Sequence, residues 1–141
     1  MRVRVVGAHN LESRETRHTC FLIEGKLALD AGSLASALSF EEQKGIRAIL
    51  VTHHHVDHTR DLPTLGLAML DGGMPIEVYG LSETLENARK HLFDGSAYPD
   101  LSTSLNGEEP RLQLHAVEPM KRFSVLGYDI TPMRAVHPVA A

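Results

Sequence analysis

Four histidines and an aspartate stand within six consecutive positions of this sequence: His53, His54, His55, Asp57 and His58. Imidazole and carboxylate groups are the usual protein ligands of zinc and of similar first-row divalent metals. If the apolar run before them is a buried strand, alternate residues leaving it point to the same side. His53 and His55 then face one way and His54 the other. Asp57 and His58 can turn back toward a second position, so the spacing predicts two neighbouring metal positions.

The elements that must hold this run are those of a mixed α/β domain. Ile46–Val51 is apolar and follows a glycine, which predicts a buried parallel strand leading into the histidines. Arg2–Gly7 alternates charged and apolar residues as an edge strand does. The apolar runs His18–Glu24 and Lys26–Asp30 flank Gly25, which predicts a tight hairpin.

Three helices are expected between and after these strands. Ser33–Gly45 has apolar residues at helical spacing and a terminal glycine, and Ser33 stands where it could cap the helix. A second helix opens at Arg60–Pro63, with proline in its first turn. A third begins with Ser82 and runs to about Phe93, with apolar residues along one face.

The last third of the chain is expected to be a long loop followed by β structure. Asp94–Pro110 is rich in glycine, serine and threonine, and is either a lid or binding loop or a floppy insertion. Leu112–Val117, Phe123–Leu126 and Tyr128–Pro132 have the pattern of strands. The β structure is expected to continue over Met133–Val136.

Composition bounds the class of protein. The chain has 141 residues, the size of one ordinary domain, and its 43% hydrophobic and 23% charged residues are typical of a soluble globular protein. The net charge of −4 gives no general basic surface for nucleic acid. No apolar run approaches the roughly 20 residues of a membrane helix, and the first residues lack a signal-peptide pattern. Cys20 is the single cysteine, so we expect a cytoplasmic protein with no internal disulfide and no membrane partner.

The motif His53-x-His55-x-Asp57-His58 resembles the signature of the metallo-β-lactamase superfamily. The resemblance implies an αββα sandwich of two similar halves, in chains considerably longer than this one. Residues 1–141 would then be the N-terminal part of a single metallo-hydrolase domain, truncated to about its first half. A truncated sandwich would expose apolar surface, so a homodimer is one arrangement to expect.

The resemblance also implies a set of ligands. His53, His55 and a strand-end histidine downstream, matched here by His137, would hold one ion, while Asp57 and His58 would begin the site of a second. The family's bridging aspartate and last histidine have no counterpart in this chain. We expect Zn²⁺, two ions per complete site, with Mn²⁺ or iron as alternatives for the same ligands.

Two positions before the motif also resemble the family. Asp30 and Gly32 match a strand-end aspartate and glycine that help to support the metal loop, which in this chain is the histidine run 53–58. The alternative is a plain turn that leads into the helix at Ser33. Both interpretations are compatible with the sequence.

A two-metal centre generates hydroxide near neutral pH and stabilises attacking and departing oxygens, so the resemblance implies a metal-dependent hydrolase. Asp57 would be its catalytic residue, which orients the water. The sequence around the motif is most similar to the phosphodiesterase and ribonuclease Z-like branch, whose substrates are cyclic nucleotides or RNA. The departure of residues 31–33 from the tRNA-processing pattern favours a small-molecule phosphodiester. The alternatives are a lactonase, thioesterase or lactamase-type hydrolase of the same fold, or a truncated metal-binding remnant without catalysis.

Overall fold

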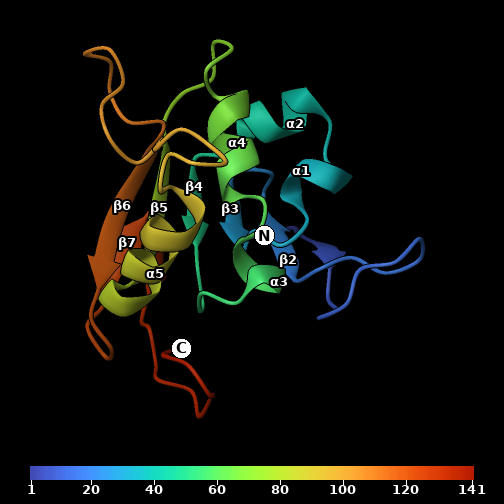
Figure 1. Ribbon diagram of the computed structural model, residues 1–141. Coiled ribbons are helices and arrows are strands. Elements are labelled where there is room, and N and C mark those ends of the chain that lie inside the picture. The colour runs from blue at the N-terminus through green and yellow to red at the C-terminus, as the bar shows by residue number, and fades with distance from the viewer.

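A six-stranded mixed sheet is the centre of the computed structural model, which describes residues 1–141 (Figure 1). Its strands are β1 (Val3–Gly7), β2 (Cys20–Ile23), β3 (Leu27–Leu29), β4 (Ala48–Leu50), β5 (Ile76–Leu81) and β6 (Leu112–Val117). They follow one another across the sheet in chain order, antiparallel from β1 to β3 and parallel from β3 to β6. The edge position of β1, the β2–β3 hairpin and the parallel strand before the histidines are as the sequence predicts.

The hairpin turn is set by local backbone geometry. Glu24 and Gly25 have φ angles of 48° and 71°, and the N–H of Lys26 donates to the carbonyl oxygen of Ile23 at 3.0 Å. Glycine reaches this left-handed region without steric cost, which closes the turn. From β3 onward each connection contains helix, which is the usual crossover between parallel strands.

Helices cover one face of the sheet (Figure 1). They are α1 (Leu34–Ala37), α2 (Phe40–Gly45), α3 (Val56–Thr59), α4 (Leu62–Ala68) and α5 (Ser82–Leu92). Ile49 and Val78 of the central strands pack with Leu34, Leu65 and Leu85 of the helices in the main buried cluster. This core packs against β4 and β5, and β4 leads into the histidine run. None of the helices is long and apolar enough to cross a membrane.

A small hairpin covers part of the opposite face. It consists of β7 (Phe123–Val125) and β8 (Tyr128–Ile130), which pair only with each other. Val125 packs against Leu27 and Ala48 in a second buried cluster, and the rings of Phe123 and Tyr79 stack with centroids 5.2 Å apart. The central sheet therefore buries apolar side chains on both faces.

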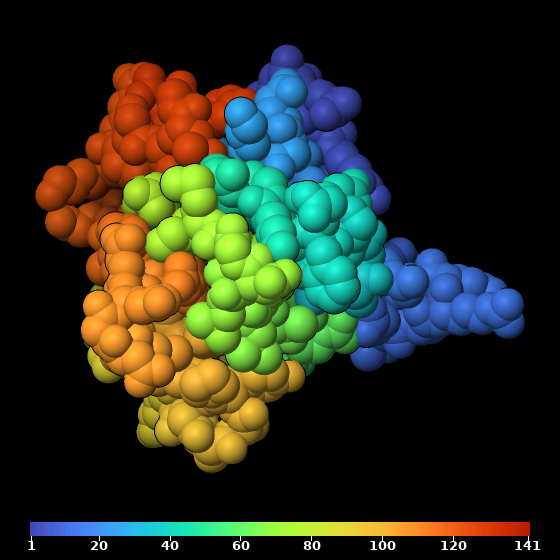
Figure 2. Space-filling view, turned by 90° about the horizontal axis from the view of Figure 1, so that it is seen from above, coloured from blue at the N-terminus to red at the C-terminus, as the bar shows by residue number.

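Two long loops are tied to the body by individual side chains. Residues 8–17 project from the molecule (Figure 2), and Glu12 in this loop pairs with Arg60. The loop Asp94–Pro110 is anchored by Leu101, which is fully buried and lies against Gly66 of α4. The second loop therefore packs against α4 at Leu101, while most of its other residues are exposed or half-buried.

The single helix expected over Ser33–Gly45 is wrong, because the structure has two short helices there. Leu38 between them is extended, with φ −111° and ψ 145°. Ser39 then starts α2 with a capping box, in which its hydroxyl accepts from the N–H of Glu42 and the Glu42 carboxylate accepts from the N–H of Ser39. The cap expected at Ser33 is also wrong, since its buried hydroxyl has no hydrogen-bond partner.

The strand expected over Met133–Val136 is absent as well. These residues belong to a segment, 131–141, that lies outside helices and strands. β8 pairs only with β7, so no neighbouring strand offers Met133–Val136 a ladder of hydrogen bonds. The segment is instead held by a bond of 2.7 Å from the N–H of Met120 to the carbonyl oxygen of Pro132 and by the hydroxyl of Thr84, which donates to the carbonyl oxygen of Ala140.

Candidate metal centre

The histidine run begins where β4 ends. The N–H of Val51 donates to the carbonyl oxygen of Tyr79 at 2.8 Å, which continues the parallel pairing one residue beyond the strand. The chain is still extended at His55, with φ −62° and ψ 149°, and α3 starts at the next residue. The alternation expected for residues leaving a strand therefore applies up to His55.

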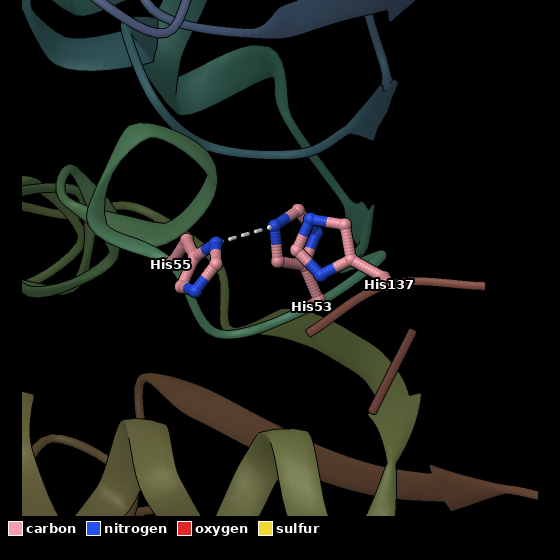
Figure 3. Close-up of side chains that lie close together, drawn as sticks. All are labelled: His53, His55 and His137. Carbon is pink, nitrogen blue, oxygen red and sulfur yellow. Dashed lines mark hydrogen bonds between the residues drawn. The ribbon is translucent and has the colours of Figure 1, made fainter. Parts of the chain in front are cut away.

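His53, His55 and His137 come together in space, although the third is more than 80 residues further along the chain (Figure 3). Each offers one ring nitrogen, and these three atoms lie within 4.8 Å of one another. Nε2 of His53 is 3.1 Å from Nδ1 of His55. The ring of His137 has its centroid 4.2 Å from that of His53 and 5.0 Å from that of His55. The ring of His54 is not part of this group.

The three imidazoles suit a divalent metal ion. Zinc sites that carry out catalysis have three protein ligands and one open position. Burial is the largest cause that lowers the pKa of His53 to about 4, and the neighbouring imidazoles add to it. His53 is therefore neutral near pH 7, as a nitrogen ligand must be. The site of the first ion thus fits the residues present, while the role of His53, His55 and His137 as ligands stays a prediction.

Asp57 and His58 lie beside this group and not within it. Nε2 of His58 is 3.4 Å from a carboxylate oxygen of Asp57, and the His58 ring centroid is 4.0 Å from that of His53. They could contribute two donors to a neighbouring ion, as the motif predicts. The group of three donors that the structure brings together is His53, His55 and His137, and it includes neither Asp57 nor His58.

Asp30 lies beneath the metal loop and holds it. Its carboxylate accepts hydrogen bonds from the N–H of Thr52 at 2.8 Å and from Nδ1 of His58 at 2.7 Å. Burial alone would lower the pKa of His58, but the hydrogen bond to Asp30 and the charges of Asp30 and Asp57 raise it above its ordinary value. Asp30 thus occupies the supporting position that the resemblance implies.

The segment after Asp30 is bound to the metal loop along its backbone. The N–H of Ala31 donates to the carbonyl oxygen of His58 at 2.7 Å, and the N–H of Asp61 donates to the carbonyl oxygen of Ala31 at 2.9 Å. Gly32 passes so close to the backbone of Asp57 that a Cβ atom there would lie 2.0 Å from its carbonyl oxygen. The strand-end glycine is therefore required by the close approach of two chain segments.

Sequence reasoning missed two further contributors. Thr52 contacts Asp30 and two imidazoles through its hydroxyl; its place directly before the first histidine was the available signal. Asp61 accepts from the N–H of Ala35 at 2.8 Å and from Arg60, and so joins α1 to the end of the metal loop. Ala35 and Asp61 are 26 positions apart, and no local pattern marks such a contact.

Comparison with known proteins identifies the class. Residues 29–141 match the beta-lactamase superfamily domain, so the chain belongs to that superfamily. A curated relative, the 3',5'-cyclic-nucleotide phosphodiesterase 1 of Saccharomyces cerevisiae, is 23% identical over 103 residues, which are 70% of this chain and 27% of that protein.

Solved structures agree with this assignment at the level of the fold. The metallo-beta-lactamase fold protein YhfI from Bacillus subtilis has a TM-score of 0.75 and 21% identity, over 98% of this chain and 54% of that chain. The short form of human tRNase Z (ELAC1) has a TM-score of 0.55 and 22% identity, over 81% of this chain and 44% of that chain. The expected metallo-β-lactamase fold is confirmed, and the chain spans about half the length of these solved relatives.

Proposed function

We propose that this chain carries the first metal position of a metal-dependent phosphodiesterase, with a cyclic nucleotide or another small-molecule phosphodiester, or RNA, as substrate. The observation that carries the proposal is the convergence of three ring nitrogens, from His53, His55 and His137, within 4.8 Å. Zn²⁺ is the expected ion, and Mn²⁺ or iron would accept the same donors.

Each residue of the site would have a distinct role in this function. The three converging imidazoles would hold the first ion, and His58 with Asp57 would take part in holding a second. Bound ions would supply the Lewis acidity that activates water and stabilises negative charge on oxygen. Asp57 would orient the attacking water and accept its proton. Asp30 would keep His58 in place through the 2.7 Å hydrogen bond.

Two observations favour a phosphodiester substrate. The yeast relative is named as a cyclic-nucleotide phosphodiesterase, and one structural relative is named as a tRNase Z. Residues 31–33 depart from the tRNA-processing pattern, which supports a small phosphodiester over tRNA. The second candidate is a metal-binding remnant without catalysis, favoured by the fact that the three-donor group includes neither Asp57 nor His58.

The test compares His55→Ala with His54→Ala, two neighbouring imidazoles of which only the first belongs to the cluster. Metal content per chain is measured by mass spectrometry, together with hydrolysis of cyclic AMP, a chromogenic phosphodiester, a lactone and a thioester. We expect His55→Ala to lose the first ion and His54→Ala to keep it, because the His54 ring lies outside the group. Equal loss in both variants would contradict the assignment of ligands.

The substrate panel separates the remaining candidates. Turnover of the phosphodiesters with metal present supports the proposal. Turnover of the lactone or thioester alone would replace it with another hydrolase of the same fold. Metal binding without any turnover would support the remnant.

A further inference from the structure

The hydroxyl of Thr52 lies at the centre of a small polar group under the metal site. Its oxygen is 3.0 Å from each carboxylate oxygen of Asp30. It is 3.1 Å from Nδ1 of His53 and 3.3 Å from Nδ1 of His58. One side chain therefore touches an imidazole of each proposed metal position, together with the buried carboxylate.

The number of available protons decides how these contacts are arranged. A hydroxyl has one proton to donate, and a carboxylate can only accept. Asp30 already accepts from the Thr52 N–H on one oxygen and from His58 on the other, at 2.8 and 2.7 Å. The Thr52 hydroxyl must donate to Asp30 as well, because two acceptor oxygens 3.0 Å apart would repel each other. Its lone pairs then remain to accept a proton from a ring.

The free lone pairs of Thr52 face Nδ1 of His53, so that nitrogen carries the proton. Nε2 of His53 is left unprotonated, and it is this atom that lies 3.1 Å from Nδ1 of His55, where the three imidazoles converge. Metal-binding histidines commonly have their second ring nitrogen fixed by such a partner.

We infer that Thr52 is a positioning residue: its hydroxyl, oriented by Asp30, fixes the tautomer and the ring orientation of His53 so that Nε2 is presented to the metal. The inference rests on the proposed metal-dependent function, since it assigns a role toward that ion. It concerns a side chain that holds a ligand and does not itself touch the ion.

The experiment uses Thr52→Val, which keeps the shape of the side chain and the backbone N–H bond to Asp30 but removes the hydroxyl. Affinity for Zn²⁺ is measured by competition with a chromogenic chelator. The tautomer of His53 is read independently in the metal-free protein, by long-range ¹H–¹⁵N correlation of the histidine rings. We expect a protonated Nδ1 in the wild type, a mixture of tautomers in Thr52→Val, and a loss of Zn²⁺ affinity of about 10- to 100-fold.

Thr59→Val is the matched control. The Thr59 side chain, at the end of α3, is buried, whereas Thr52 is exposed. The Thr59 hydroxyl donates to the backbone carbonyl oxygen of His55 at 2.9 Å and has no ring nitrogen among its partners. Its loss should lower thermal stability and leave the His53 tautomer unchanged. Thr52→Ser, which restores a hydroxyl, should recover the wild-type tautomer and affinity.

Two results separate the inference from the proposed function. A Thr52→Val protein with wild-type affinity and a protonated His53 Nδ1 overturns the inference. A wild type that binds no Zn²⁺, with a tautomer that still changes in Thr52→Val, upholds the hydrogen-bond arrangement and overturns the proposed function. If Thr52→Val does not fold, Thr52→Ala takes its place, because it removes the same hydroxyl and the same release of His53 is expected.

Discussion

The close approach of Gly32 to the metal loop can be tested with a single methyl group. In Gly32→Ala the new Cβ atom would lie 2.0 Å from the carbonyl oxygen of Asp57 and 2.6 Å from Cβ of His18. Ordinary contact begins near 3.4 Å, so the Asp57 carbonyl must move by about 1.4 Å, the difference between 3.4 and 2.0 Å. A backbone carbonyl cannot rotate aside as a flexible side chain can, and the first turn of α3 has to move with it.

The cost follows from this overlap. Overpacking at a fixed site costs about 1–3 kcal/mol. A chain of 141 residues has an unfolding entropy of about 0.3 kcal/mol/K, from about 2.1 cal/mol/K per residue, so Tm should fall by about 3–10 °C. A displacement of Asp57 on the order of 1 Å should also reduce hydrolysis by about 10²-fold where turnover is measurable.

Thermal unfolding followed by circular dichroism measures the first effect, and a Zn²⁺ titration with turnover measures the second. Gly45→Ala is the control, since a Cβ atom there meets nothing closer than 3.4 Å and the glycine closes helix α2. Its Tm should equal or slightly exceed that of the wild type. If Gly32→Ala were as stable as Gly45→Ala and kept its activity, the proposed contact between strand end and metal loop would be refuted.

Two further predictions concern the helices and the histidines. Ser39→Ala should destabilise the fold by about 1 kcal/mol because it removes the capping box, while Ser33→Ala should cost nothing because that hydroxyl makes no hydrogen bond; urea unfolding of both variants checks this, and equal losses would contradict it. Metal-free protein should lose stability as the pH falls from about 6.5 toward 4. In this range His53 is protonated in the unfolded state but stays neutral in the folded state, where its pKa is about 4. Stability should also be lost as the pH rises through the raised pKa of His58, whose folded form holds its proton longer. Urea midpoints are measured from pH 4 up through the raised pKa of His58. His53→Gln should lose the fall in stability on the acid side, and His58→Gln should lose the fall on the alkaline side. A fall that persists in its variant refutes the assignment.

The parts of the site that depend on local pattern could be predicted from the sequence. The apolar run before the histidines is a strand in the structure, and the alternation at its end separates His53 and His55 from His54 as expected. Strand periodicity is a property of neighbouring residues, so it needs no knowledge of the rest of the chain. The resemblance added His137, which local spacing could never connect to a run more than 80 residues earlier.

The two wrong predictions of secondary structure have separate physical reasons. The sequence Ser39-Phe40-Glu41-Glu42 has the serine and glutamate spacing of a capping box, but the helical spacing of apolar residues around it suggested one continuous helix. The local propensity of Met133–Val136 is that of a strand. A strand also needs a neighbour, and β8 offers none.

The contacts that support the site were beyond sequence reasoning for a different reason. Asp30 and Thr52 are 22 residues apart, and Glu12 and Arg60 are 48 apart. Their pairing depends on the parallel register of β3 and β4 and on the path of the projecting loop. Neither can be derived from composition or spacing.

The third imidazole arrives on a stretch of chain without a ladder or a helical turn of its own. Residues 131–141 are fastened by a few isolated hydrogen bonds, whereas His53 and His55 stand at the end of a packed strand. An ion bound by His53, His55 and His137 would link the end of the packed strand to the loosely held segment 131–141. Its affinity would then include the conformational entropy that this segment loses when it is ordered. Resistance of residues 131–141 to proteolysis would then increase with metal occupancy, and a chelator that removes the ion would make this stretch sensitive to proteolysis.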